Sequence, residues 1–293
     1  MQPVASLAAP VFEIDLLDQH VRELAGDVPL ARFSLQPLND LMGGVFPGRM
    51  TALGATPGAG KTTLMQQMAE DLAEQGMPVI FVSAELPAPK LISKSLSRLS
   101  DGALAVSDVA DAAGRVAGGR GPFQSALDHY RESIAGNLCI LADFDLTEIT
   151  QMAASCARER GVTPVLFIDY LQLVATSGAE PFMDERLAIA SCVRDLRYLA
   201  NCFRVPVFAI STITRGDYGK KAPTLSVFGG TATIEYSFDT ALLLTEDQGT
   251  GASRLGPVGE RPMVLSALKN RYGALGSAHL SFDCAHATFR ERG

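Results

Sequence analysis

Residues 54–63 read Gly-Ala-Thr-Pro-Gly-Ala-Gly-Lys-Thr-Thr and connect an apolar run, Met50–Gly54, to an amphipathic one, Gly60–Gly76. The first run predicts a buried strand. The second predicts a helix, because its apolar residues recur three or four positions apart. A glycine-rich turn that opens a helix presents backbone N–H groups and a partial positive charge to a phosphate. We therefore expect this stretch to bind the phosphates of a nucleotide, with an ordinary Gly-rich turn as the alternative.

The residues of this loop have separate expected tasks. Gly58 and Gly60 permit backbone conformations that a Cβ would block. Lys61 is expected to reach the β- and γ-phosphates, and the Thr62 hydroxyl to bind Mg²⁺. Position 55 is alanine where the usual pattern has glycine. The nucleotide-binding residues that we predict are Thr56, Pro57, Gly58, Ala59, Gly60, Lys61, Thr62 and Thr63.

Two carboxylates follow other predicted strands. Asp169 ends the run Val-Leu-Phe-Ile-Asp that starts at Val165, and it is expected to bind Mg²⁺ opposite Thr62, where α/β sheets hold ligands. Glu85 comes just after the predicted strand Pro78–Ser83 and is a candidate base for an attacking water. The alternatives are a strand-end cap for Asp169 and a solvated side chain for Glu85.

The rest of the chain alternates short apolar, β-branched runs with longer amphipathic ones, such as the predicted helix Thr147–Arg160. This alternation predicts an α/β fold, with a mainly parallel central sheet and helices on both faces. Asp108–Gln124, rich in Ala and Gly, predicts a flexible helix and loop, and Gly249–Pro262 an exposed hairpin connection. Strands are predicted at Met50–Gly54, Pro78–Ser83, Leu138–Leu141, Pro164–Ile168, Pro206–Ile210, Thr240–Leu244 and Met263–Ala267.

The composition excludes several classes of protein. Of 293 residues, 47% are hydrophobic and 19% charged, which suits a packed core and not a disordered chain. The net charge of -7 argues against a broadly basic protein that coats nucleic acid. The longest stretch without a charged residue, Ala222–Ile234, is too short to span a bilayer, so no membrane association is expected. Five scattered cysteines and the lack of a secretory signal in Met1–Pro10 predict a cytoplasmic protein.

Taken in order, the motifs from about Ser34 onward resemble the RecA-like ATPase domain of DnaB-type replicative hexameric helicases. That family has alanine at the first position of its phosphate loop, as here at Ala55. The Asp-Tyr-Leu-Gln-Leu run and the late Lys-x-Arg are the more specific parts of the resemblance. The matching segments are Leu41–Gly48, Ala55–Thr63, Ser83–Pro87, Ile168–Leu173, Val205–Ser211, Thr233–Glu235 with Asp239, and Lys269–Gly273.

The resemblance implies a RecA-like P-loop NTPase that hydrolyses ATP with Mg²⁺ at sites shared between the subunits of a homo-hexameric ring. Glu85 would activate water, and Thr212 stands at the γ-phosphate sensor position. Lys269 and Arg271 would reach into the neighbouring subunit's ATP and stabilise charge there. Their alternative interpretation is a solvated edge strand, since alternating positions share one face. Single-stranded DNA is the implied track, and separate loader or replication proteins are possible partners.

The chain departs from that family at three places. We expect residues 1–33 to form an N-terminal arm ahead of an ATPase domain at residues 34–293, without the family's collar domain. Within the arm, Val11–Ala25 predicts an amphipathic helix that packs on its own domain or docks on the next subunit. Thr212 replaces a glutamine, whose longer side chain spans a greater distance.

The third departure concerns DNA. The stretch Gly229-Gly-Thr-Ala232 is uncharged where the family has an arginine and an acidic residue, which weakens the electrostatic attraction for DNA. Nearby cations can replace that charge, or they are a solvated loop. The candidate DNA contacts are Arg215, Lys220, Lys221, Gly229 and Gly230.

Three functions follow as hypotheses. The first is a ring-forming, ATP-driven motor that translocates on DNA or unwinds it. The second, suggested by the uncharged loop and Thr212, is an ATPase ring of the same fold that remodels or organises a protein partner without unwinding DNA. The third is a nucleotide-gated binding module with negligible hydrolysis. The set of Glu85, Asp169, Lys269 and Arg271 argues against the third, because a binding switch does not need all four.

Overall fold

The computed structural model describes Leu17 and residues 28–115, 121–177, 184–213, 225–228, 236–247 and 260–292. Apart from Leu17, the predicted helix Val11–Ala25 lies outside these ranges. So does the predicted connection Gly249–Pro262 up to residue 259. The five candidate DNA contacts also lie outside them: Arg215, Lys220, Lys221, Gly229 and Gly230.

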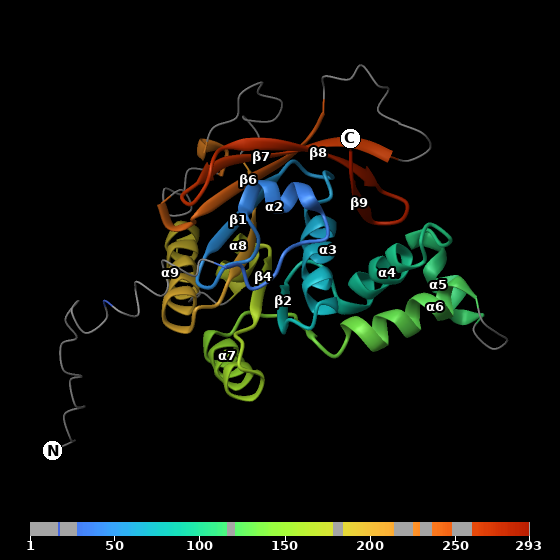
Figure 1. Ribbon diagram of the computed structural model, residues 1–293, viewed down its shortest axis with the longest axis horizontal. Helices are drawn as coiled ribbons and strands as arrows, with labels where there is room; N and C mark the ends of the chain where they lie inside the picture. Colours follow the sequence, from blue (N-terminus) through green and yellow to red (C-terminus); the bar gives the residue numbers. More distant parts are fainter. Residues whose placement is uncertain are drawn as a thin grey trace.

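The described strands form one sheet of nine, in the order β3-β2-β4-β5-β1-β6-β7-β8-β9 (Figure 1). The parallel part confirms six predicted strands: β1 (Met50–Ala55), β2 (Val79–Ser83), β3 (Leu138–Leu141), β4 (Val165–Asp169), β5 (Val207–Ser211) and β6 (Thr240–Glu246). The antiparallel part contains one predicted strand, β7 (Glu260–Asn270), and two that were not predicted, β8 (Gly276–Asp283) and β9 (Thr288–Glu291).

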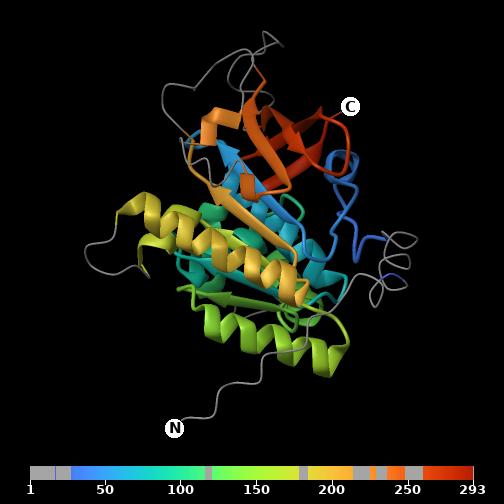
Figure 2. The ribbon, with the colours of Figure 1, turned by 90° about the vertical axis from the view of Figure 1, so that its left-hand side faces the viewer.

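Two layers of helices cover the sheet, which confirms the predicted fold class. Successive side chains of a strand point to opposite faces. Leu53 of β1 accordingly packs in a core with α2 (Gln36–Met42), α3 (Lys61–Glu74) and α4 (Ala88–Leu99). Its neighbour Ala52 packs with α7 (Leu146–Arg160), α8 (Leu171–Ser177) and α9 (Glu185–Phe203). Figure 2 shows α7 and α9 lying along the strands on that second side.

Aromatic rings hold the centre of the first core together. Phe81, Phe167 and Phe208 come from the adjacent strands β2, β4 and β5 and form a row across the sheet. The ring centroids are 6.1 Å apart for the first pair and 5.0 Å for the second, both stacked. Such pairs add to the free energy gained from burying the rings. The row stabilises the strands at whose carboxyl ends the predicted site residues lie.

A helical lobe is inserted between β2 and β3 and projects to one side of the sheet (Figure 1). It contains α4, the short helices η1 (Val106–Asp108) and α5 (Val109–Gly114), α6 (Pro122–His129) and the π-helical η3 (Tyr130–Ile134). The predicted flexible segment Asp108–Gln124 thus holds α5 and the start of α6. None of the described helices is both long and apolar enough to cross a membrane.

A buried polar cluster ties this lobe to α3. Glu70 on α3 is almost completely buried and forms an ion pair with Arg98 on α4. The Ser95 hydroxyl also contacts the Glu70 carboxylate, at 2.5 Å, and the Gln66 amide donates to it at 2.8 Å. A buried charge without a partner is costly, so this pairing specifies how α4 sits on α3.

Candidate nucleotide site

The predicted phosphate loop lies between β1 and α3, at the carboxyl end of β1. Gly58 and Gly60 have φ angles of +79° and +87°, which side chains with a Cβ rarely adopt. The Ala59 N–H donates to the Thr56 carbonyl at 3.1 Å and closes the loop. Ala55 still belongs to β1, where it pairs with Leu244, and its φ is not positive. Alanine therefore fits there without strain.

The antiparallel extension packs directly against this loop. The rings of Phe282 on β8 and Phe289 on β9 are stacked, with centroids 4.4 Å apart. A Cβ added to Gly60 would come within 2.7 Å of the first ring and 2.9 Å of the second. Gln67 of α3 exchanges two hydrogen bonds with the backbone of Phe289, at 2.8 and 2.9 Å. Only glycine at position 60 allows the extension to lie so close.

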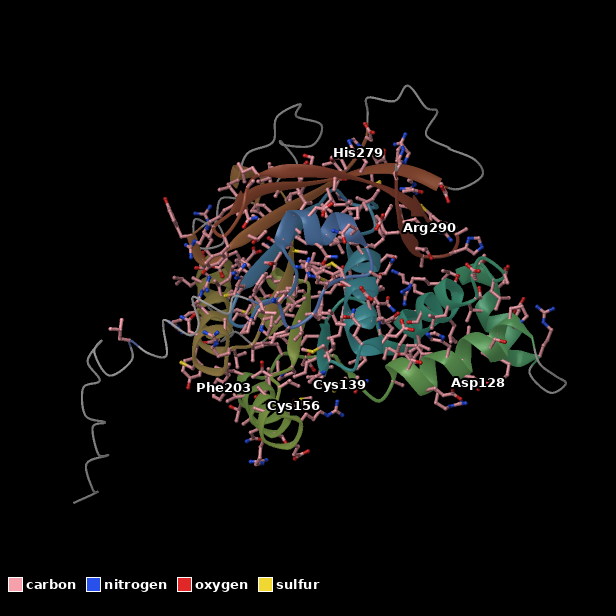
Figure 3. The ribbon with its side chains drawn as sticks, in the orientation of Figure 1. Asp128, Cys139, Cys156, Phe203, His279 and Arg290 are labelled. Atoms are coloured by element: carbon pink, nitrogen blue, oxygen red, sulfur yellow. The ribbon has the colours of Figure 1, made fainter. Side chains whose placement is uncertain are left out.

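Charged side chains add to the contact between the antiparallel extension and the phosphate loop. Arg261 on β7 donates to the Gly58 carbonyl at 3.1 Å. Arg290 on β9, labelled in Figure 3, lies 3.5 Å from Glu260 on β7 and 3.4 Å from Asp283 on β8, so it links the three strands. None of these contacts was predicted from the sequence, because each depends on how the antiparallel strands pack together and against the loop.

Asp169 ends β4 as predicted, and its environment fits a divalent cation. The side chain is fully buried, and neither carboxylate oxygen accepts a well-formed hydrogen bond within the described part of the chain. Burial raises the pKa of this carboxyl to about 6, although the Thr62 hydroxyl and the cations Lys61 and Lys94 oppose the rise. A buried carboxylate with unused oxygens beside a threonine hydroxyl is a donor set that suits Mg²⁺.

Glu85 lies at the same edge of the sheet as Asp169. β2 and β4 are neighbours, and Ser83 is paired with Asp169 in their register. The turn after β2 is held by the Ala84 N–H, which donates to the Asp169 carbonyl at 2.9 Å. The Ser83 hydroxyl holds it further by donating to the Leu86 carbonyl at 2.6 Å. Glu85 is exposed, and its charge contributes to the raised pKa of Asp169.

Lys94 is a site residue that was not predicted from the sequence. It lies on α4 and donates to the Thr63 hydroxyl at 3.3 Å. Burial lowers the pKa of its amine, and so does Lys61, whereas Asp169 and Glu85 oppose the change. A lysine that is partly desolvated and faces two carboxylates is typical of a functional site. Helix α4 was not among the predicted elements, so no sequence pattern placed Lys94 here.

Thr212 follows β5 at the same edge, with an exposed side chain. Gln172 at the start of α8 holds it in place. The Gln172 side chain donates to the Ser211 hydroxyl at 2.9 Å and accepts from the Thr212 N–H at 3.2 Å. The Gln172 amide therefore connects the element that follows Asp169 to the predicted sensor position.

Lys269 and Arg271 lie beside the amino-terminal ends of β1 and β6, opposite to the ends that carry the nucleotide site. Lys269 pairs with Ala241 at the start of β6, and β6 runs parallel to β1 with Thr240 opposite Thr51. Ala241 is paired with Ala52 of β1, so three further residues of β1, or roughly 10 Å, separate the level of Lys269 from the phosphate loop. The Lys269 amine donates to the Phe238 carbonyl at 2.6 Å, and Arg271 contacts Asp239 at 3.0 Å. Within one chain, these two cations do not meet the nucleotide site.

This sheet and site define a class of protein. A mainly parallel sheet flanked by helices, a glycine-rich loop that leads from β1 into α3 and a buried carboxylate at the end of β4 are the features of a RecA-like P-loop NTPase. A family model described as the DnaB-like helicase C terminal domain matches residues 32–291. The chain therefore belongs to this family, which confirms the resemblance found in the sequence.

Individual proteins agree with the family match. The chain is 27% identical over 264 residues to the replicative DNA helicase DnaB of Treponema pallidum (strain Nichols), covering 87% of this chain and 54% of that protein. It spans about half the length of the curated relatives it matches.

Solved structures share the fold. One ATPase domain superposes with a TM-score of 0.80 at 19% identity, covering 97% of this chain and 100% of that one. A DnaB-like replicative helicase, studied for its interactions with primase, superposes with a TM-score of 0.78 at 19% identity, covering 95% and 68%. At these identities the likeness concerns the fold alone.

Proposed function

We propose that this protein is the ATPase motor of a DNA helicase, which assembles into a hexameric ring like its family, hydrolyses Mg²⁺-ATP and moves along single-stranded DNA. One observation carries the proposal. The nucleotide-site side chains converge at the carboxyl ends of the parallel strands, namely Lys61, Thr62, Glu85, Lys94 and Asp169. The two cations Lys269 and Arg271, called the finger from here on, lie at the opposite ends of the strands. We assign residues 34–293 to the motor and residues 1–33 to an arm that precedes it.

In this proposal the loop Thr56–Thr63 wraps the phosphates of ATP with its N–H groups, and Lys61 neutralises the β- and γ-phosphates. Thr62 and Asp169 would hold Mg²⁺, whose charge offsets that of the phosphates. Glu85 accepts the proton of the attacking water as its oxygen approaches the γ-phosphorus. Lys94 adds a second cation beside Thr63, and Thr212 reports whether the γ-phosphate is present.

The finger residues complete the site of a neighbouring protomer. Because Lys269 and Arg271 cannot reach the phosphate loop of their own chain, we assign them to the ATP of the next subunit. There they would stabilise the charge that develops during phosphoryl transfer. The arrangement makes hydrolysis depend on assembly.

We propose single-stranded DNA and other proteins as partners, in line with the family. The proposed DNA contacts are Arg215, Lys220, Lys221, Gly229 and Gly230. One solved relative is described with its primase interactions, and we propose replication or loader proteins as partners here too. The five cysteines are free thiols, which suits a reducing cytoplasm.

The rate of ATP hydrolysis with and without single-stranded DNA, measured over a salt series, tests the proposal. We expect stimulation that fades as salt rises, because phosphate contacts weaken with ionic strength. Lys61→Ala, which removes the phosphate-binding amine, should abolish hydrolysis with and without DNA. A rate that DNA does not change at any salt concentration contradicts a DNA motor and favours the alternative, a ring that remodels or organises a protein partner.

A further inference from the structure

Asp239 is the centre of a buried cluster at the finger end of the sheet. Its side chain is 2% exposed and lies just before β6. One carboxylate oxygen accepts from the Met50 N–H at 2.9 Å. Arg197 of α9 contacts both oxygens, at 3.2 and 3.3 Å, and Arg271 contacts one of them at 3.0 Å. Two arginines therefore share one buried carboxylate.

The backbone around Asp239 is fixed independently of these side chains. The Asp239 N–H donates to the Met50 carbonyl at 2.8 Å, and the Arg271 N–H donates to the Asp239 carbonyl at 3.0 Å. These bonds join the start of β6 to β1 on one side and to the end of β7 on the other. Asp239 thus sets the position from which the Arg271 side chain leaves the sheet.

The two arginines differ in how firmly they are held. The Arg197 side chain is 25% exposed and projects from a 19-residue helix that packs along the sheet. The Arg271 side chain is 46% exposed and lies in the turn after β7, where its second contact is the Tyr236 carbonyl at 2.6 Å. One guanidinium is enough to balance one carboxylate, so the charge of Arg271 is in excess within the chain.

We propose that Asp239 positions Arg271 for catalysis, and that Arg197 is the resident counter-charge that lets Arg271 leave Asp239 for the γ-phosphate of the neighbouring protomer. The inference rests on the composite site proposed above. Without Arg197, departure of Arg271 would leave the buried Asp239 carboxylate without a cation, which is strongly unfavourable. With Arg197 in place, the Arg271 guanidinium is free to form charge-assisted bonds to a phosphate.

The first test replaces Asp239 with asparagine, which keeps the shape and removes the charge. Because the variant's own phosphate loop is intact, we expect kcat to fall about 10- to 100-fold with little change in KM, as for a misplaced catalytic group. Mixing Asp239→Asn with Glu85→Gln should then partly restore hydrolysis, since the Glu85→Gln protomer still donates a well-placed finger. Damage to the Asp239→Asn fold would not be repaired by such a partner.

The second test keeps Asp239 and changes its counter-charge, in case asparagine at position 239 prevents folding. Arg197→Met should lower kcat about tenfold or more, because Arg271 becomes the cation that must stay with Asp239. Arg197→Lys should retain most of the rate. Arg194→Met, in the same helix with a side chain 76% exposed, is the matched control and should behave like the wild type.

A mixture of Arg271→Ala with Glu85→Gln provides the reference. If that mixture regains activity while Asp239→Asn and Arg197→Met, each mixed with Glu85→Gln in the same way, do not, Asp239 and Arg197 have only a structural role and the inference is overturned. A wild-type kcat for Arg197→Met overturns it as well. If the Arg271→Ala mixture regains nothing at any ratio, the composite site itself fails, and this inference fails with it.

Discussion

The amine of Lys94 lies 3.3 Å from the Thr63 hydroxyl, so helix α4 brings a cation to the first turn of the helix that follows the phosphate loop. The same amine is close enough to Asp169 and Glu85 for their charges to act on its pKa. The lobe between β2 and β3 therefore contributes to the nucleotide site. Any movement of α4 relative to α3 would change the charge that faces the phosphates.

Lys94→Met is expected to lower kcat about 10- to 100-fold, because one positioned donor to a developing charge contributes that much or more. Lys94→Arg should retain part of the activity. The matched control is Lys90→Met, one turn earlier on the same helix and exposed. Steady-state ATP hydrolysis measures all three variants. Equal rates for Lys94→Met and Lys90→Met would remove Lys94 from the site.

Asp169 predicts an unusual dependence of stability on pH in metal-free protein. Its pKa is about 6 when folded, against 3.8 in its ordinary state, so the folded protein binds more protons between these values. The free energy of unfolding therefore falls as pH rises from about 4 to about 6, by about 3 kcal/mol from this residue. Asp169→Asn removes that loss.

Urea unfolding with a chelator present measures this effect. At about pH 8, Asp169→Asn should be more stable than the wild type by up to about 3 kcal/mol, and the difference should vanish below about pH 4. Added Mg²⁺-ATP should stabilise the wild type and leave the variant nearly unchanged. A variant that is less stable than the wild type at about pH 8 without metal would show that the carboxylate is not desolvated as described.

Gly60→Ala tests the contact between the phosphate loop and the antiparallel extension. The new Cβ would meet the rings of Phe282 and Phe289, in addition to the strain of a φ of +87°. The control is Gly76→Ala, with a φ of +85° and no atom within 4 Å of its Cβ. We expect Gly60→Ala to lower the free energy of unfolding by about 1–3 kcal/mol more than the control. Equal losses in the free energy of unfolding would mean that the two rings move aside and accommodate the new Cβ without cost.

The Glu70–Arg98 pair predicts opposite results for single and double substitutions. Burial lowers the pKa of Arg98 to about 10, although Tyr130 opposes the change. Glu70→Gln should cost about 3–5 kcal/mol of stability because it leaves a buried guanidinium unpaired, whereas Glu70→Leu combined with Arg98→Met should be close to neutral. Thermal and urea unfolding measure both. A double variant as unstable as the single one would contradict this account.

The sequence predicted the elements with strong periodicity and the site at the ends of parallel strands. Six apolar runs became the parallel strands, and the carboxyl ends of such strands meet at one edge. For that reason Asp169 and Glu85, which were predicted separately as a Mg²⁺ ligand and a base, lie at the same edge although they are far apart in the chain. The strand β8 was not predicted because Gly276-Ser-Ala-His-Leu-Ser-Phe-Asp283 contains mostly small or polar residues. Its two large apolar residues, Leu280 and Phe282, belong to the buried core.

The periodicity of the sequence does not predict which side chains of distant elements contact each other. Arg197 and Asp239 lie 42 positions apart, and Gly60 meets rings at positions 282 and 289. Nothing in either segment alone specifies its partner, because each contact depends on how two elements pack. Lys94 was missed for the same reason. The predicted roles of Lys269 and Arg271 came from the family resemblance, and the fold adds that they lie away from their own phosphate loop.

The claim that hydrolysis needs a neighbouring protomer is tested most directly by ATP turnover per chain over a dilution series, with the oligomeric state measured in the same samples. We predict that turnover per chain falls in step with the oligomer and is nearly absent in the monomer, because Lys269 and Arg271 then have no phosphate within reach. Monomers that hydrolyse ATP at the rate of the assembled protein would contradict the composite site.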